Sequence, residues 1–495
     1  MKSSVCIIGA GMGGLTAGAF LAKSGFDVTI LEKATSVGGS AGFYTRKDRR
    51  FPTGATVAFG LEEDGILTKI LNELKIQPPK MELLHPMDVI LPDRKVSIFK
   101  DKGRWERELQ MSFSEREKDV LLFWKKLEQI GEDVLSVTRN EVSFPIQRMY
   151  DLGSYPSFAF KNPLSVTRVT KYATWTVEKL LRTYNLHTYL PLRQFLDAQL
   201  VDAVQTDVTE AALLPSSVAL TIYRKGSFAI ENGIGQLCEL LKDYIIQLGG
   251  RVFLSSPLKK VQFDQTNRLW QVESKKCNES FSTIINNSGI SFDDNTSYED
   301  SDFSWGAFRI DATLRKEVAN QLQGNTLPFA FQIVSDNPQL ATYCHNPIYA
   351  TIHETQSGGK DYLCEVLMSI SVHTEDKRWI QLSQEFYKKE KNTLMDLLMQ
   401  EVEKVFPFNN HLLFAEAGTP LTYKRFVGKT KVGGFPLTVK NAVWKPRSFR
   451  TKLPNWYIVG EQAFPGPGTL SAALSGYYAS RAIIKEYSKK GYNTH

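Results

Sequence analysis

Glycines near the start of the chain are spaced so that backbone atoms could bind a phosphate group. Gly9, Gly11 and Gly14 form a G-x-G-x-x-G pattern, and Gly13 lies inside it. The first glycine permits a tight turn after an apolar strand pattern, the second lets the backbone approach a diphosphate, and the third lets helix and strand pack closely. Unpaired N–H groups at the start of the following helix favour an anion. This spacing predicts a dinucleotide-binding turn.

A carboxylate follows where it could bind a sugar. Glu32 ends a second apolar strand pattern over 27–31, and a carboxylate there can accept both ribose hydroxyls of an adenosine while repelling a 2′-phosphate. Lys33 comes next, and the glycines Gly38 and Gly39 would let backbone pass close to the same cofactor. A surface turn is the alternative interpretation of that glycine pair. Together these residues favour a dinucleotide other than NADP.

A second strand, loop and helix pattern lies near the far end of the chain. An apolar run at 455–459 stops at a Gly-Glu pair, and a Gly/Pro loop leads into a helix predicted over 472–487. If this strand joins the first sheet, Glu461 reaches cofactor hydroxyls and the helix N-terminus faces an electron-rich end of the cofactor. An ordinary strand-to-helix connection is the alternative. The cofactor-binding residues predicted here are Gly460, Glu461, Gly468, Thr469 and Leu470.

The two ends of the chain together resemble the FAD-dependent carotenoid desaturase and isomerase family, which also includes retinol saturases. The most specific resemblance is to the carotenoid cis-trans isomerase form, whose G-G-S-S-G-Y-Y and F-D-x-G-S-S-V-x-F-G motifs are similar to Gly38–Tyr44 and Phe51–Gly60. Ser40 and Gly54 belong to these two motifs. Further similar segments are Phe195–Ala198, Gly233–Leu237, Gly249–Val252, Pro257–Val261, Val459–Glu461 and Pro465–Gly468.

The resemblance implies that FAD is the cofactor. In flavoproteins of this plan the residue at Leu258 meets the adenine through its backbone, and the acid at Glu461 meets the ribityl chain. The sequence also departs from the family pattern, because Pro52 stands where an aspartate is common and Ser40 stands where desaturases carry an arginine. Ser40 thus removes a cation that could offset the charge of the diphosphate.

The same resemblance implies an α/β fold, with a Rossmann-type FAD-binding domain built from discontinuous segments and an inserted α+β substrate domain. We expect the FAD-binding domain to comprise 1–85, 226–292 and 416–495. A helical insertion facing substrate and membrane is expected at 86–225, and a substrate domain at 293–415. Insertions of this length are long enough to build a substrate domain over the cofactor.

Local patterns agree with that division. They predict a helix over 233–248 and strands at 251–254 and 282–287 in the middle FAD-binding segment. The first insertion is mostly helical by pattern. The second contains β-like runs such as Thr342–Cys344 and Tyr362–Met368.

The function that the resemblance implies is redox or isomerisation chemistry on carotenoid-like polyenes. Hydride and proton removal would create a double bond, or a reduced flavin would lower a cis-trans barrier, and both reactions stay open. A long apolar channel suits such substrates, because polyenes form few hydrogen bonds. Two alternatives are a flavin amine oxidase and an escort of prenylated proteins that dispenses with flavin. Glu32 and Glu461 argue against the escort, which has no evident need for either carboxylate.

The sequence marks no catalytic base and no metal site. The seven histidines are scattered, and no H-E-x-x-H motif, Ser-His-Asp order or C-x-x-C pair is present. Arg425 and Lys429 fall where the family plan returns to the flavin, although a solvated cationic turn is the alternative interpretation. The catalytic residues are therefore left unassigned.

Length and charge limit the partners and location. A chain of 495 residues with 42% hydrophobic and 23% charged residues is typical of a multi-domain globular protein. The net charge of +7 is too small and too dispersed to predict nucleic-acid binding. The apolar run after Met1 is too short for a signal peptide, and no uninterrupted apolar stretch predicts a spanning helix. We therefore expect a cytoplasmic protein.

Aromatic and basic residues interleave in the first insertion. This mixture suits a headgroup boundary, where rings bury their bodies and basic groups meet lipid phosphate. A peripheral membrane surface is therefore one prediction, and an ordinary core beneath solvated cations is the other. The residues are Phe144, Tyr150, Tyr155, Phe158, Phe160, Tyr172 and Trp175, with Arg148, Lys161, Arg168, Lys171, Lys179 and Arg182.

Overall fold

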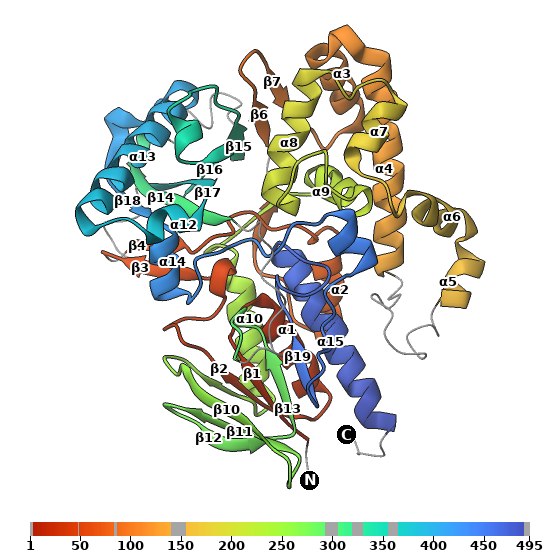
Figure 1. The fold of residues 1–495 in the computed structure, drawn as a ribbon, viewed down its shortest axis with the longest axis vertical. Coiled ribbons are helices and arrows are strands. Elements are labelled where there is room, and N and C mark those ends of the chain that lie inside the picture. Colours follow the sequence, from red (N-terminus) through yellow and green to blue (C-terminus); the bar gives the residue numbers. More distant parts are fainter. Residues whose placement is uncertain are drawn as a thin grey trace.

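A parallel five-stranded sheet forms the lower half of the molecule in Figure 1, with strand order β19-β13-β1-β2-β9. Its neighbouring strands come from the beginning, middle and end of the chain: β19 Trp456–Ile458, β13 Thr283–Asn286, β1 Ser4–Ile8, β2 Asp27–Leu31 and β9 Arg251–Phe253. The computed structural model describes residues 3–47, 49–83, 87–139, 155–292, 305–318, 330–354 and 365–489.

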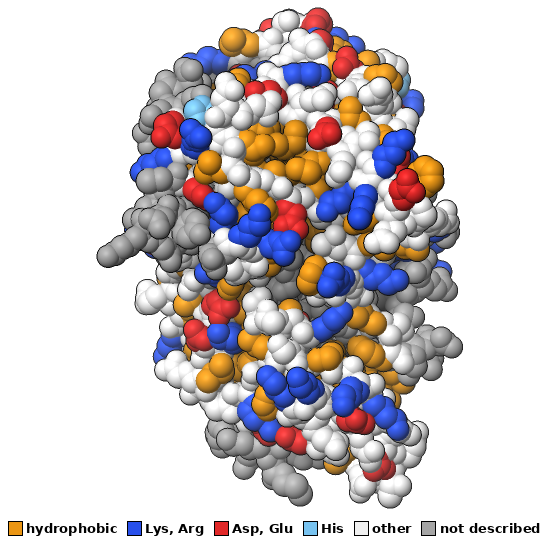
Figure 2. All heavy atoms as spheres, turned by 90° about the vertical axis from the view of Figure 1, so that its left-hand side faces the viewer, with side chains coloured by type: hydrophobic (Ala, Val, Ile, Leu, Met, Phe, Trp, Pro, Cys, Tyr) orange, Lys and Arg blue, Asp and Glu red, His pale blue; other side chains and the backbone are white. Residues whose placement is uncertain are grey.

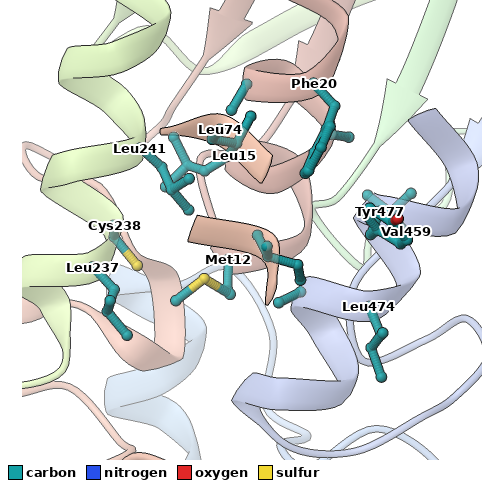
Figure 3. Packing of buried hydrophobic residues seen from close by; sticks show 14 of the residues in the cluster. Met12, Leu15, Phe20, Leu74, Leu237, Cys238, Leu241, Val459, Leu474 and Tyr477 are labelled. Atoms are coloured by element: carbon teal, nitrogen blue, oxygen red, sulfur yellow. The ribbon is translucent and has the colours of Figure 1, made fainter. Parts of the chain in front are cut away.

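Apolar side chains on both faces of these strands explain the burial of the sheet. Val5 and Ile7 point to one face, where three helices pack: α1 Met12–Lys23, α10 Gly235–Gln247 and α15 Thr469–Lys489. Figure 3 shows side chains of these helices in one cluster, among them Met12 and Leu15 of α1, Leu237 and Leu241 of α10, and Leu474 of α15.

The other face of the sheet is covered by an antiparallel meander. Trp270 and Phe281 of the meander pack against Cys6, Ile284 and Trp456, with the Trp270 and Trp456 rings 4.7 Å apart. The meander consists of β10 Leu258–Asp264, β11 Leu269–Ser274 and β12 Asn278–Phe281. The chain therefore has a Rossmann-like layered α/β core.

A seven-stranded sheet lies above this core, at the upper left of Figure 1, in the order β18-β14-β17-β16-β15-β6-β7. Its strands are β18 Leu412–Gly418, β14 Gly306–Arg315, β17 Glu365–Thr374, β16 His345–Glu354, β15 Ala330–Ile333, β6 Asp88–Ile90 and β7 Lys95–Ser97. Helices α12 Asp376–Ile380 and α13 Gln384–Val405 supply Trp379 and Leu398 to its core. Two strands from the segment 86–225 thus complete a sheet built mainly from later residues.

Helices from the first insertion gather at the upper right of Figure 1. Trp105, Trp124 and Phe195 lie buried at their centre. The helices are α3 Lys102–Ser112, α4 Glu117–Arg139, α5 Tyr155–Lys161, α6 Pro163–Tyr172, α7 Val177–Thr183, α8 Leu190–Val204 and α9 Leu213–Lys225. Further α-helices are α2 Ile66–Leu74 and α14 Pro420–Phe426. Two short strand pairs are formed by β3 Phe43–Arg46 with β4 Arg49–Pro52 and by β5 Met81–Leu83 with β8 Phe228–Ile230.

The structure confirms the predicted helix at 233–248 as α10 and the predicted helix at 472–487 as the body of α15. The β-like interpretation of Thr342–Cys344 is wrong. A 3-10 turn occupies Leu340–Thr342, and β16 begins only at His345. Leu340 and Cys344 are both buried, so their apolar character reflects a turn packed into the core. Phe144, Arg148 and Tyr150 lie outside the described residues.

Basic side chains are dispersed on the face that includes α13. Figure 2 shows Lys and Arg there among acidic and hydrophobic side chains, rather than in one continuous stripe. Within the described part of the chain, no helix has both the length and the apolar composition needed to cross a bilayer.

Candidate functional site

The glycine turn opens onto the start of α1. Gly9 has a φ of +96° and donates its N–H to the Leu31 carbonyl at 2.8 Å, which ties the turn to β2. No side chain caps α1 at Gly11, so the first N–H groups of the helix are left for an anion. A Cβ on Gly14 would lie 2.6 Å from the Gly9 carbonyl oxygen. Close packing therefore requires glycine at this third position.

The Glu32 carboxylate lies at the edge of the turn. Its two oxygens accept the backbone N–H groups of Ala10 and Ala34, each at 2.7 Å. These hydrogen bonds fix the orientation of the carboxylate and leave further lone pairs for ribose hydroxyls. Lys33 is exposed, and its Nζ donates to the Arg425 carbonyl at 3.4 Å.

The second glycine pair packs against the first turn. Gly38 has a φ of +110° and donates its N–H to the Ala10 carbonyl at 2.8 Å. Gly38 also forms an isolated β-bridge with Gly11, and Gly39 has a φ of +56°. Both glycines adopt backbone conformations that other residues rarely accept. This segment therefore lies beside the predicted phosphate-binding turn.

Ser40 and Gly54 lie next to each other in the following segments. The Ser40 carbonyl accepts the Ala55 N–H at 2.9 Å, and a Cβ on Gly54 would lie 2.7 Å from the same oxygen. No side chain fits at Gly54 without a backbone shift.

Strand β19 brings the late Gly-Glu pair to the same edge of the sheet. Val459 donates its N–H to the Asn286 carbonyl at 2.9 Å, and Gly460 donates its N–H to Ser475 Oγ at 2.6 Å. Glu461 forms an ion pair with Lys429, with both side chains less than a fifth exposed. Lys429, which follows Arg425 in the predicted cationic turn, therefore contacts the site through Glu461.

Asn287 joins the early and late segments. Its Nδ2 donates to the Gly9 carbonyl at 3.2 Å. A Cβ on Gly11 would lie 2.7 Å from Asn287 Nδ2, and a Cβ on Gly460 would lie 2.7 Å from Asn287 Oδ1. The two ends of the chain thus meet around one side chain. The sequence offers no signal for this, since an asparagine after a strand is ordinary until the neighbouring strands are known.

One cavity of about 1980 Å³ runs along these segments. Every predicted cofactor-binding residue lines it except Gly14, which packs helix against strand. Leu258, at the start of β10, and Gly468, Thr469 and Leu470, at the start of α15, are among the lining residues. The structure thus brings the predicted residues together around one space.

The same cavity continues between the helices of the first insertion. Its walls there are aliphatic, with few groups that could hydrogen-bond to a ligand. These side chains come from α4, α6 and α9: Val134, Val137, Val166, Val169, Leu214, Val218 and Ile222. We call this part of the cavity the apolar arm.

Arg309 of β14 lies buried beside the segment that carries Gly54. Its guanidinium donates to both Asp311 carboxylate oxygens, at 2.9 and 3.0 Å, and to the Gly54 carbonyl at 2.6 Å. The Tyr44 hydroxyl donates to Asp311 at 2.9 Å. Burial alone would lower the pKa of Arg309, but the Asp311 charge outweighs burial and raises it. The cluster therefore keeps a paired cation and anion against the cofactor-binding segment.

Two histidines that are separate in sequence become neighbours in the second sheet. His345 and His373 are cross-strand partners, and both rings lie against Trp305. Burial, with a smaller contribution from His345, lowers the pKa of His373 to about 4. His373 lines the cavity, so it presents a neutral imidazole there at physiological pH.

Comparison with known proteins supports this arrangement. Residues 7–74 match the model for the NAD(P)-binding Rossmann-like domain. The chain is 24% identical to the chloroplastic prolycopene isomerase of Arabidopsis thaliana, over 97% of this chain and 82% of that protein. A stretch of 57 residues is 46% identical to phytoene desaturase of Fusarium fujikuroi, covering 12% of this chain and 10% of that protein. The chain is thus similar in sequence to carotenoid desaturases and isomerases.

A solved structure shares the fold of this chain. Putrescine oxidase with bound putrescine superposes with a TM-score of 0.62 at 12% sequence identity, covering 98% of this chain and 99% of that one. This likeness shows the fold alone. The chain is an enzyme of the oxidoreductase and isomerase class, with a dinucleotide-binding Rossmann-like domain.

Proposed function

We propose that this protein is an FAD-dependent enzyme that desaturates carotenoid-like polyenes or isomerises their conjugated double bonds. One observation carries the proposal: a single cavity is lined both by the predicted cofactor-binding residues and by the aliphatic side chains of the apolar arm. A polyene buries apolar surface along its whole length and needs few polar partners. The relatives that act on carotenoids support this substrate class.

The chain's own residues fit the parts of FAD in the proposed order. The backbone at Gly11 and Gly13 and the uncapped start of α1 would bind the diphosphate. Glu32 would accept the ribose hydroxyls, the Leu258 backbone would meet the adenine, and Glu461 would accept hydroxyls of the ribityl chain. FAD bound there would supply two-electron redox chemistry, while the protein binds and orients the substrate and excludes water.

Glu461→Gln tests the ribityl assignment. We expect the Kd for FAD to rise about 10-fold, because hydrogen bonds to a charged acceptor are stronger than those to an amide. The Kd is measured by flavin fluorescence during titration of the apoprotein. Glu106→Gln is the control, since Glu106 of α3 is an exposed partner of Lys102 and does not line the cavity. Equal Kd values for both variants would contradict the assignment.

Cofactor extraction and product analysis test the whole proposal. The purified protein should be yellow and release FAD on denaturation, and cells accumulating a linear polyene should yield a desaturated or isomerised product when they express the chain. A folded, colourless protein that takes up no FAD would favour a non-enzymatic escort. Hydrogen peroxide produced from amines, with polyenes unchanged, would favour an amine oxidase.

A peripheral membrane surface is part of the proposal. Phe160 of α5 and Leu164 of α6 are 90% and 70% exposed, and Lys161 and Lys171 are exposed beside them. Exposed apolar groups beside cations suit an anionic headgroup boundary. Flotation with anionic vesicles should retain the wild type and release the double variant Phe160→Ser/Leu164→Ser. Equal flotation of the two proteins would contradict this surface.

A further inference from the structure

One carboxyl group in the cavity has no partner among the residues that the structure describes. Asp202 of α8 lines the cavity and, within the described residues, forms no hydrogen bond or ion pair through its carboxylate. Other acids around the cavity are engaged: Glu32 accepts two backbone N–H groups, Asp311 binds Arg309, and Glu461 binds Lys429. An unpaired carboxylate is costly in an apolar wall, so its presence there calls for a reason other than stability.

Asp202 lines the same cavity as the predicted cofactor-binding segments and the apolar arm. Its ionisable neighbours are Tyr223 of α9 and Tyr349 of β16. Tyr349 hydrogen-bonds to Thr56, and the Tyr223 ring contacts Phe59 at a centroid distance of 4.9 Å. Thr56 and Phe59 lie in the Phe51–Gly60 motif, which also contains Gly54. These residues and Asp202 line the same cavity as Gly54.

The C-terminal end of α8, just after Asp202, also contacts the late cofactor-binding segment proposed above. A Cβ on Gly433 would lie 2.7 Å from the Gln205 side chain, and a Cβ on Gly434 would lie 2.4 Å from the Glu461 carbonyl oxygen. The residues that follow Asp202 therefore contact the loop that packs on the late Gly-Glu pair. Asp202 thus faces the space where the proposed substrate would pass the proposed cofactor.

The surroundings of Asp202 suit proton transfer. Burial raises its pKa to about 6, so the carboxylate is ionised at neutral pH and accepts a proton readily. Burial also raises the pKa of Tyr223 and of Tyr349, so both phenols stay neutral. Arg309 is committed to Asp311, and His373 is neutral with a pKa of about 4. Among these groups, Asp202 has the pKa best matched to a base at neutral pH.

We propose that Asp202 is the catalytic base that takes the substrate proton during desaturation, an inference that rests on the proposed function. FAD bound in the cavity would accept one hydrogen of a CH–CH unit together with its bonding electron pair. The neighbouring C–H bond breaks so that its electron pair forms the new π bond, and the proton goes to a carboxylate oxygen of Asp202. The resulting carboxylic acid then loses this proton to solvent, which restores the base.

A binding experiment tests, without turnover, whether Asp202 lies close to the bound substrate chain. We add a fully conjugated linear carotene, the reaction product, and record its bound absorption spectrum between pH 4.5 and 8. The absorption of a conjugated chain responds to a nearby charge, so the wild-type spectrum should shift with a midpoint near pH 6. Asp202→Asn should bind the carotene and show no such shift.

Turnover provides the second readout. We expect Asp202→Asn to keep its FAD and its fold and to lose at least about 100-fold in kcat for desaturation. Wild-type kcat/KM should rise as pH increases through about 6, because only the ionised carboxylate accepts the proton. Asp197→Asn is the matched control: Asp197 lies on the same helix and burial also raises its pKa to about 6, but its carboxylate accepts the Val208 N–H at 2.8 Å outside the cavity lining.

The outcomes separate this inference from the proposed function. A wild type that binds FAD and desaturates polyenes, with a pH-independent carotene spectrum and equal kcat in Asp202→Asn, would overturn the role of Asp202 alone. Isomerisation as the sole reaction, without exchange of substrate hydrogen for solvent deuterium, would also overturn it. A wild type that binds neither FAD nor carotene would overturn both proposals.

Discussion

Gly11→Ala should lose FAD while the protein still folds. Gly11 has φ −77° and ψ 173°, which alanine adopts without strain, and the added Cβ would lie 2.7 Å from Asn287 Nδ2, so the Asn287 side chain must shift away from its hydrogen bond to the Gly9 carbonyl. The methyl group would also occupy the approach to the start of α1, where the diphosphate should accept N–H groups. Losing charge-assisted hydrogen bonds of about 1.5–3 kcal/mol corresponds to an increase in Kd of about 10- to 100-fold. Flavin absorbance per protein and FAD titration measure the effect.

Gly103→Ala provides the matched control for that substitution. Gly103 lies in the first turn of α3, and a Cβ there would meet only Asp101 Oδ1 at 3.6 Å. Far-ultraviolet circular dichroism should be the same for both variants and for the wild type. If Gly11→Ala bound FAD as tightly as Gly103→Ala, the diphosphate would have to bind elsewhere.

Arg309→Met should lower the free energy of unfolding by about 3–5 kcal/mol, because it leaves a buried carboxylate without its cation. The side chains of Arg309 and Asp311 are only 6% and 4% exposed, and the guanidinium also holds the Gly54 carbonyl. The loss should therefore weaken the contact between the second sheet and the cofactor-binding segment. Urea unfolding followed by tryptophan fluorescence measures the change.

Arg46→Met is the control for the buried pair. Arg46 pairs with Glu416 at 2.9 Å, but the two side chains are 57% and 39% exposed, so its loss should cost less than about 1 kcal/mol. The double variant Arg309→Met/Asp311→Leu should recover most of the stability, since it removes both buried charges. Equal destabilisation by Arg309→Met and Arg46→Met would refute the argument from burial.

The cofactor-binding residues were the part of the site most accessible from sequence. Gly9, Gly14 and Gly38 are needed for turns and close backbone contacts, and such needs are set by residues a few positions away. The apolar runs of β1 and β2 likewise predict that these strands are buried on both faces, before any partner strand is known. Their assignment to FAD, and the domain boundaries, remain proposals.

Other features depended on which distant segments become neighbours. The β-like run at Thr342–Cys344 proved to be a buried turn, because apolar residues do not distinguish a strand from a turn packed in the core. Strands β6 and β7 joined the second sheet by pairing with β15, a contact between residues far apart in the chain. The local strand propensity of a segment does not indicate which distant strand it will pair with.

By itself, the sequence determined the βαβ unit, the glycine turns and the carboxylates that follow two strands, because each depends on short-range backbone geometry. Tertiary structure alone decided that Asn287 bridges Gly9 and Gly460, that Arg309 is neutralised by Asp311, and that Asp202 is left unpaired in the cavity. An ionisable side chain acquires its chemistry from what surrounds it, and those surroundings exist only after separate segments of the chain have packed together.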